Sequence, residues 1–257
     1  MTTLHHSWFM TIRHVRALIR QPIWVFITLV QPLIWLLLYG ALFKRVVEIP
    51  GFGGGSYLDF LTPGIIVMSA LFSSGWSGMA LLDDLDRGVL DRFLMSPVSR
   101  VSLIAGRLAQ GALIVVVQSL ILVVLALISG ADLAGGPLGV LVLIAGSILL
   151  GWSFGSLSNG LALIVRREET LIAAVNLVIL PLTFLSTVFM QRSLTPAWIQ
   201  DVAKVNPVDW AVTGGREAVA RDPDWGLVLG RSALLLAFAL LCTWFASRAC
   251  RAYQRSV

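Results

Sequence analysis

The chain has 257 residues, of which 57% are hydrophobic and 13% are charged, about half the charged fraction of an ordinary soluble domain. The mean hydropathy of +0.86 and apolar blocks of about 20 residues, the length that crosses a bilayer core as a helix, exclude a water-soluble globular fold. The net charge of +5 does not indicate nucleic-acid binding, because the basic residues separate apolar blocks instead of forming one stripe. We expect a single all-helical membrane domain.

The first expected element is an amphipathic helix at the cytoplasmic membrane surface, before the first apolar block. Trp8 and Ile12 lie on one face of this helix, which would enter the acyl region of the lipid. A neighbouring face would place guanidinium groups among anionic headgroups and carries Arg13, Arg16 and Arg20. Two interpretations remain open, an ordinary membrane anchor and a helix that transmits force from a partner.

Six membrane spans follow from the apolar blocks. We place them at residues 22–43, 58–80, 108–130, 138–165, 171–189 and 225–247. With the N-terminus inside, the cytoplasmic segments hold most of the 19 lysine and arginine residues, namely Arg13, Arg16, Arg20, Arg87, Arg92, Arg100, Arg107, Arg166, Arg167, Arg248, Arg251 and Arg255. Because short cytoplasmic loops are enriched in these residues, we expect both termini to be cytoplasmic.

The loop between the second and third spans predicts a short cytoplasmic helix that ends before Pro97. Leu81 and Leu85 begin an i, i+4 ladder, whereas Leu90 and Leu94 point to another side. Two apolar faces indicate two partners, the bundle itself and a protein that docks from the cytosol. A solvated loop is the alternative.

The spans themselves contain almost no charge, so an ion-coupled carrier has no obvious residues with which to work. Ladders of small residues in spans two and four favour close packing within the bundle, and in span five Pro181 predicts a kink. Amphiphilic cargo suits aromatic walls with few polar groups. The residues predicted to line a substrate path are therefore Phe72, Trp76, Asn176 and Phe184.

The sequence contains no G-x-x-x-x-G-K-[ST] phosphate-binding loop, so we expect no ATP hydrolysis by this chain. No metal site is expected at the three histidines, which lack zinc-site spacing. One enzyme alternative remains, in which Asp83, Asp84 and Asp86 hold Mg²⁺ against a lipid pyrophosphate, as in an intramembrane prenyl-transferring enzyme. An ion-coupled secondary carrier is the other alternative.

Two stretches resemble the ABC-2 type permeases, a family that includes drug exporters and bacterial carriers of lipids and polysaccharides. Asp86-Arg-Gly-Val-Leu-Asp-Arg-Phe-Leu-Met-Ser-Pro-Val-Ser-Arg100 is similar to the family's cytoplasmic segment, with Val89 in place of the usual threonine. The second stretch combines Pro181-Leu-Thr-Phe-Leu-Ser-Thr-Val-Phe, Leu194-Thr-Pro-Ala-Trp198, Asn206-Pro-Val-Asp-Trp and Arg216 in the family's order and spacing.

The resemblance implies an all-α polytopic membrane protein with six transmembrane helices, an N-terminal interfacial connecting helix, a cytoplasmic coupling helix and an extracytoplasmic re-entrant helical hairpin over 191–222. It implies one domain, with the connecting helix over 1–21, the bundle over 22–247 and a cytoplasmic tail over 248–257. The residues it assigns to coupling with the ATPase are Asp86, Arg87, Gly88, Leu90, Asp91, Arg92 and Leu94.

The same resemblance implies the partners. Two copies of a separate ABC ATPase would bind ATP and Mg²⁺, and a second permease copy or a close paralogue would complete the transporter in the cytoplasmic membrane. The expected activity is export of a hydrophobic or amphiphilic compound, such as a drug, an antibiotic, a lipid or a lipid-linked glycan.

Overall fold

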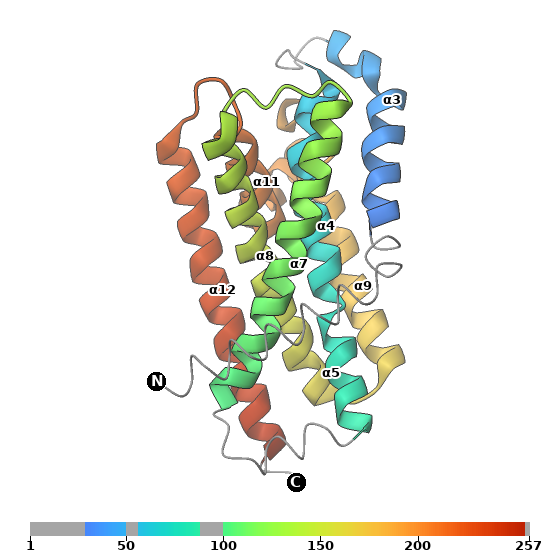
Figure 1. Cartoon of the computed structure of the whole chain (residues 1–257), viewed down its shortest axis with the longest axis vertical. Helices are drawn as coiled ribbons and strands as arrows, with labels where there is room; N and C mark the ends of the chain where they lie inside the picture. Colours follow the sequence, from blue (N-terminus) through green and yellow to red (C-terminus); the bar gives the residue numbers. More distant parts are fainter. Residues whose placement is uncertain (1–28, 50–55, 88–99, 255–257) are drawn as a thin grey trace.

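The structure is a computed structural model that describes residues 29–49, 56–87 and 100–254, with the backbone alone for 100–107 and Gln254. Within these ranges the chain is helical and has no β-strand. The long helices run side by side along the longest axis of the molecule (Figure 1). An all-helical bundle agrees with the prediction from hydropathy.

Most of the bundle is made of six helices, with two short helices at one end. Their bounds are α4 Tyr57–Gly75, α5 Ser77–Asp86, α7 Arg100–Ile128, α8 Gly136–Val165, α9 Glu168–Phe184, α10 Ala197–Val205, α11 Pro207–Ala218 and α12 Trp225–Gln254. A further helical segment, Leu29–Leu42, contains the π-helical turn η1 (Trp35–Tyr39) and ends in α3 (Gly40–Leu42). The short 3-10 helices are η2 (Lys44–Glu48) and η3 (Arg192–Leu194).

Four helical segments among the described residues are long and apolar enough to cross a membrane: Tyr57–Asp86, Leu108–Ile128, Gly136–Val165 and Trp225–Tyr253. They coincide with the predicted second, third, fourth and sixth spans. The first predicted span is described only from Leu29, and α9, at the fifth, has 17 residues. The structure is therefore that of an all-helical protein consistent with a polytopic membrane protein, while the count of six spans stays a prediction.

Helix α8 lies at the centre and packs against α4, α5, α7, α9, α11 and α12. Small residues make this possible, because a Cβ added to Gly151 would lie 2.6 Å from Ser74 Oγ and one added to Gly78 would lie 2.6 Å from the Ser158 carbonyl oxygen. Such close backbone approach is the usual role of small residues in membrane helices. The ladders of small residues are thus packing surfaces within the bundle, as predicted.

The second predicted span is not one continuous helix, because α4 ends at Gly75 and α5 begins at Ser77. Ser158 on α8 bridges the break: its Oγ donates to the Gly75 carbonyl at 2.5 Å and accepts from the Gly78 N–H at 3.1 Å. Backbone groups at a break inside a membrane need such partners. The break at Trp76 was not predicted, since its partner lies far away in the sequence.

The segment after α9 folds back as two short helices, α10 and α11, which agrees with the predicted pair of helices in this loop. The predicted span over 171–189 is wrong at its end, because α9 stops at Phe184. Pro181 lies inside this helix, three residues before its end. In Figure 1, α11 lies beside α8 in the half of the molecule opposite the α5 end.

Candidate functional site

A cavity of about 600 Å³ lies between the α4–α5 break, α7 and α8. Pockets of this size hold drug-sized molecules. Its apolar lining includes the two indole rings Trp76 and Trp152 together with Met79, Leu108 and Ile114. In Figure 1 these three elements meet in the half of the bundle that carries α5.

Polar side chains also line this cavity and come from each of its walls. They are Ser73, Ser74, Ser77, Asp83, Gln110 and Asn159. The Asn159 amide is fixed by its nitrogen, which donates to the Gly155 carbonyl at 2.7 Å and to Ser77 Oγ at 3.2 Å. Its oxygen Oδ1 is buried and accepts no hydrogen bond from any described residue, a state that costs about 1–3 kcal/mol if it stays unpaired.

Of the four residues predicted to line a substrate path, the structure places one at the cavity. Trp76 is part of the lining, whereas Phe72 packs against the hydrophobic core. Asn176 is half-buried on α9, a helix that contributes no residue to the cavity. Of the four predicted residues, only Trp76 lines this cavity.

Phe184 lies elsewhere, at the edge of an aromatic cluster that joins the Leu29–Leu42 segment to α4 and to the turn after α9. Its ring is 61% exposed and its centre lies 5.9 Å from that of Phe189. Phe189 in turn contacts Trp35 at 5.3 Å and Tyr39 at 5.5 Å. Ring pairs at these distances attract each other, so Phe189 connects the Leu29–Leu42 segment to the end of α9.

The polar residues after α9 are used within the fold. Thr183 and Ser186 donate to backbone carbonyls of their own helix and turn. Thr187 donates twice to Asp209 Oδ1 on α11, from its N–H at 3.0 Å and from its Oγ1 at 2.6 Å. Asp209 is fully buried, and hydrogen bonds to a buried carboxylate are strong. Thr187 therefore joins two elements of the fold, whereas Thr183 and Ser186 bond within their own helix and turn.

Arg216 on α11 also contacts the turn after α9. Its guanidinium lies over the Phe60 ring, 3.6 Å from the centroid. It donates to three backbone carbonyls, those of Phe60 at 3.1 Å, Thr187 at 2.9 Å and Val188 at 3.4 Å. One side chain of α11 therefore connects the start of α4 to the turn after α9. We call Asp209, Arg216 and Thr187 the α11 clasp.

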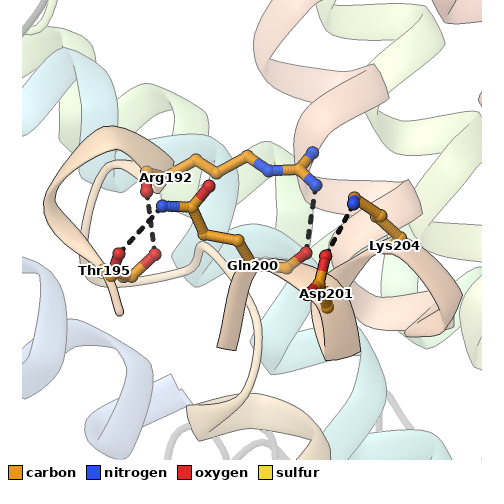
Figure 2. A network of polar contacts seen from close by, with 5 residues as sticks. All are labelled: Arg192, Thr195, Gln200, Asp201 and Lys204. Atoms are coloured by element: carbon orange, nitrogen blue, oxygen red, sulfur yellow. Dashed lines mark hydrogen bonds and ion pairs between the residues drawn. The ribbon is translucent and has the colours of Figure 1, made fainter. Parts of the chain in front are cut away.

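The loop that contains α10 is closed by its own network, which Figure 2 shows. Arg192 donates to the Gln200 carbonyl at 3.0 Å, and Gln200 Nε2 donates to the Thr195 carbonyl at 2.9 Å. Lys204 donates to Asp201 at 2.6 Å, and this bond holds the pKa of the exposed Asp201 carboxyl below its usual value. These contacts define the shape of the segment before α11.

The predicted coupling segment is described only in part. Asp86 is the last residue of α5, and Arg87 follows it; both are exposed. Gly88, Leu90, Asp91, Arg92 and Leu94 lie outside the described residues, as do Trp8, Ile12, Arg13, Arg16 and Arg20 of the predicted interfacial helix. The end of α5 lies at the same end of the bundle as the α8–α9 turn and the end of α12 (Figure 1).

The magnesium alternative gains no support from the structure. Asp83, Asp84 and Asp86 are all described, yet the described residues contain no group of three or more His, Cys, Asp or Glu side chains that could hold a metal ion. The lipid-pyrophosphate chemistry considered above would need such a group.

Sequence reasoning missed Gln110 and Asn159, which line the cavity. Asn159 is the one amide of α8, and Gln110 is one of two amides in the apolar helix α7. One signal was available, because polar residues inside apolar spans are uncommon and are often functional.

Comparison with known proteins agrees with this architecture. The model of the ABC-2 type transporter family matches residues 5–219. The chain is 31% identical over 242 residues to the "Daunorubicin resistance ABC transporter permease protein DrrB1" of Streptomyces coeruleorubidus, which covers 91% of this chain and 82% of that protein. It is 27% identical over 234 residues to the "Inner membrane transport permease YadH" of Escherichia coli strain K12. The aligned region covers 86% of this chain and 87% of that protein.

A third relative covers a similar part of the chain. The "Putative transport permease ycf38" of Porphyra purpurea is 30% identical over 208 residues, or 80% of this chain and 70% of that protein. The family match takes in α4 to α11 together with the earlier segments. The chain therefore belongs to the ABC-2 type transporter family and is a multi-pass membrane subunit of an ABC transporter.

Proposed function

We propose that this subunit forms the transport path of an ATP-driven exporter whose ATPase is a separate polypeptide. The observation that carries this proposal is the family match over residues 5–219 in a sequence with no phosphate-binding loop. Two copies of the ATPase and a second permease, either the same chain or a close paralogue, would complete the transporter. ATP and Mg²⁺ would then bind to the partner.

We propose a hydrophobic or amphiphilic compound as the cargo. The large cavity with two indole rings and few charges supports this class, because such walls suit amphiphiles. The name of one relative includes resistance to daunorubicin, which favours an antibiotic over a lipid or a lipid-linked glycan as the first compound to test.

The proposed topology has six spans and both termini in the cytoplasm. The four long apolar helices support it, and so does the position of five arginines at helix ends. Arg87 follows α5, Arg166 and Arg167 join α8 to α9, and Arg248 and Arg251 lie near the end of α12. These helix ends lie at one end of the bundle (Figure 1). Positive residues near span ends favour the cytoplasmic side. The helices α10 and α11 would then form the outer re-entrant hairpin.

The proposed coupling element starts where α5 ends, at Asp86 and Arg87. ATP-driven closure of the ATPase dimer would push on this end and on the interfacial helix, and the bundle would tilt against its mate. The two ATPase states must contact the segment differently, since a contact equal in both states would shift no equilibrium.

The test uses the chain co-expressed with an ATPase that carries a Walker A loop, in inside-out vesicles. We expect Mg·ATP to drive daunorubicin uptake, and we expect alanine in place of the Walker A lysine of the partner to abolish it. An uncoupler should leave uptake unchanged. Uptake driven by an ion gradient without ATP would instead establish the secondary carrier, and Mg²⁺-dependent turnover of a prenyl pyrophosphate by the chain alone would establish the enzyme.

A further inference from the structure

The cavity between α4, α5, α7 and α8 combines an apolar body with hydrogen-bonding groups that no described residue satisfies. Three of its lining residues carry a group without a partner in the described part of the chain: the half-buried Gln110 has its amide, the half-buried Trp76 has its indole N–H, and Asn159 has the buried oxygen Oδ1. Other polar lining residues are used internally, such as Ser77, whose Oγ donates to the Gly155 carbonyl. The cavity thus offers both donors and acceptors.

These unsatisfied groups define a chemical class of ligand. Oxygen Oδ1 of Asn159 can only accept, the Trp76 N–H can only donate, and the Gln110 amide can do both. A hydroxyl group satisfies such a mixed set because it donates one hydrogen bond and accepts others. A buried anion is disfavoured, since the one charged side chain among the described lining residues is the acidic Asp83.

We propose that this cavity binds an amphiphile whose apolar body lies against Trp76, Met79 and Ile114 and whose hydroxyl group hydrogen-bonds to Gln110 and Asn159. The site lies within one subunit and needs neither ATP nor the ATPase for binding. Its role in transport rests on the proposed function, whereas binding itself does not. Either a small exported compound or a hydroxyl-bearing membrane lipid would have this chemistry.

Substitutions at the cavity, each with a matched control outside it, distinguish a loss of ligand binding from a loss of folding. A Cβ added to Gly111, which lines the cavity, would meet no atom within 4 Å, and the same holds for Gly146, which does not line it. Gly111→Leu should therefore place apolar volume at the cavity lining with open space at its Cβ, and Gly146→Leu is its matched control. Gln110→Leu removes an amide with no partner among the described residues, whereas Gln118→Leu removes an amide on the same helix that accepts from Ser69 outside the cavity.

The experiment uses the full chain in phosphatidylcholine nanodiscs with an alkylphenol that carries a photoactivatable diazirine on its alkyl tail. Labelled peptides are identified by mass spectrometry. We expect labelling of α7 near Leu108–Ile114 and of α8 near Gly151–Asn159, and about five- to tenfold less with the methyl ether of the probe, which cannot donate a hydrogen bond. Gly111→Leu should reduce cavity labelling at least about tenfold, while Gly146→Leu leaves it unchanged.

The amide variants test hydroxyl recognition directly. Gln110→Leu should remove most of the preference for the phenol over its ether, while Gln118→Leu should keep that preference. The proposal is overturned if the phenol and the ether label equally, if Gln118→Leu acts like Gln110→Leu, or if labelling falls only on the exposed α9 residues Leu177 and Leu180. Because the readout is a ratio of two probes on one variant, a partly destabilised variant remains informative.

A change of lipid assigns the source of the natural ligand. Phosphatidylglycerol presents hydroxyl groups, whereas phosphatidylcholine has no hydrogen-bond donor. Loss of phenol labelling in phosphatidylglycerol nanodiscs would support the site and assign it to a membrane lipid. Unchanged labelling would support the site and assign it to a smaller compound. Failure of ATP-driven uptake with preserved labelling would count against the proposed export and not against this site.

Discussion

The guanidinium of Arg216 on α11 lies 3.6 Å from the centre of the Phe60 ring on α4, and its donors reach three backbone carbonyls. These carbonyls belong to two different segments, the first turns of α4 and the turn after α9. A guanidinium is suited to this arrangement because it is planar, carries five N–H donors and stacks on aromatic faces. The relationship makes α11 a structural connector between the two segments.

Arg216→Met should destabilise the protein by about 2–4 kcal/mol, because the stacked charge and its hydrogen bonds are lost while the carbonyls stay in place. The measurement is the free energy of unfolding from a titration with sodium dodecyl sulfate in mixed micelles. The free energy of unfolding of Arg216→Lys should lie between those of the parent and Arg216→Met, since lysine keeps the charge without the planar guanidinium group.

Arg221→Met is the matched control for that substitution. Arg221 is 83% exposed and pairs with Asp132 at 3.7 Å, and exposed pairs contribute at most about 1 kcal/mol. Equal losses in the Arg216 and Arg221 variants would contradict a special role for Arg216.

Thr187 and Asp209 should be energetically coupled. Each single substitution, Thr187→Val and Asp209→Ala, removes the 2.6 Å bond between Thr187 Oγ1 and Asp209 Oδ1. A double-mutant cycle isolates that bond, and hydrogen bonds to charged groups contribute about 1.5–3 kcal/mol. We therefore expect the effects of the two substitutions to be non-additive by about that amount in the same unfolding titration. Additive effects within about 0.5 kcal/mol would show that the contact contributes little.

Ser158 should stabilise the break between α4 and α5. Ser158→Ala removes the partner of both the Gly75 carbonyl and the Gly78 N–H, and each unsatisfied buried group costs about 1–3 kcal/mol. Ser156→Ala is the control, because Ser156 Oγ on the same helix is buried but has no hydrogen-bond partner in the described ranges. We expect the Ser158 variant to unfold at clearly lower detergent fractions and the Ser156 variant to be at least as stable as the parent. The reverse order would contradict the bridging role.

Much of the fold follows from hydropathy alone. The predicted fourth span, 138–165, differs from α8 (Gly136–Val165) by two residues at its start. The sixth, 225–247, begins at the same residue as α12 but ends too early, because α12 continues to Gln254. Arg248 and Arg251 mark the edge of the apolar block but do not end a helix, since long basic side chains can extend to the membrane surface.

The errors occur where distant residues decide the local structure. The helix at span five ends at Phe184, although apolar residues follow, because Thr187 bonds Asp209 and the Asn206 amide donates to the Leu182 and Leu185 carbonyls. The break at Trp76 depends on Ser158. No local pattern encodes such partners, so hydropathy predicts the position of a helix better than its end.

Sequence patterns indicate fewer of the cavity residues than of the helices. Trp76 is predicted to line a substrate path as an aromatic residue within an apolar span, and it lines the cavity, whereas the path itself stays a prediction. Gln110 and Asn159 become recognisable only when α7 and α8 are placed beside the α4–α5 break. Phe184 was chosen on the same argument as Trp76, but its position beside Phe189 gives it a place in the aromatic cluster.

Leu90 and Leu94 give a direct test of the coupling segment. Both are predicted to face a docked cytosolic protein, so Leu90→Asp or Leu94→Asp should abolish ATP-dependent uptake and reduce co-purification of the ATPase. Membrane insertion should be unchanged, and fractionation of membranes measures it. A buried carboxylate without a partner is costly at a docking surface. Normal uptake in both variants would show that Leu90 and Leu94 do not bind the ATPase, whatever compound is transported.

At Gly64, α4 meets the backbone after α9. A Cβ at this position would lie 2.7 Å from the Val188 carbonyl oxygen and 3.2 Å from Val188 Cα. Because backbone atoms cannot move aside as a flexible side chain can, Gly64→Ala should force α4 away from the turn and should cost about 1–3 kcal/mol. The same displacement would lengthen the hydrogen bonds that Arg216 makes to Thr187 and Val188.

Gly146→Ala provides the control for Gly64→Ala, since a Cβ there meets no atom within 4 Å. Alanine is the better helix former, so this variant should be unchanged or more stable by up to about 1 kcal/mol. Combining Gly64→Ala with Arg216→Met should then cost less than the two separate losses together, because the first substitution already weakens what the second removes. Full additivity would show that the α4 contact and the α11 clasp hold the turn independently.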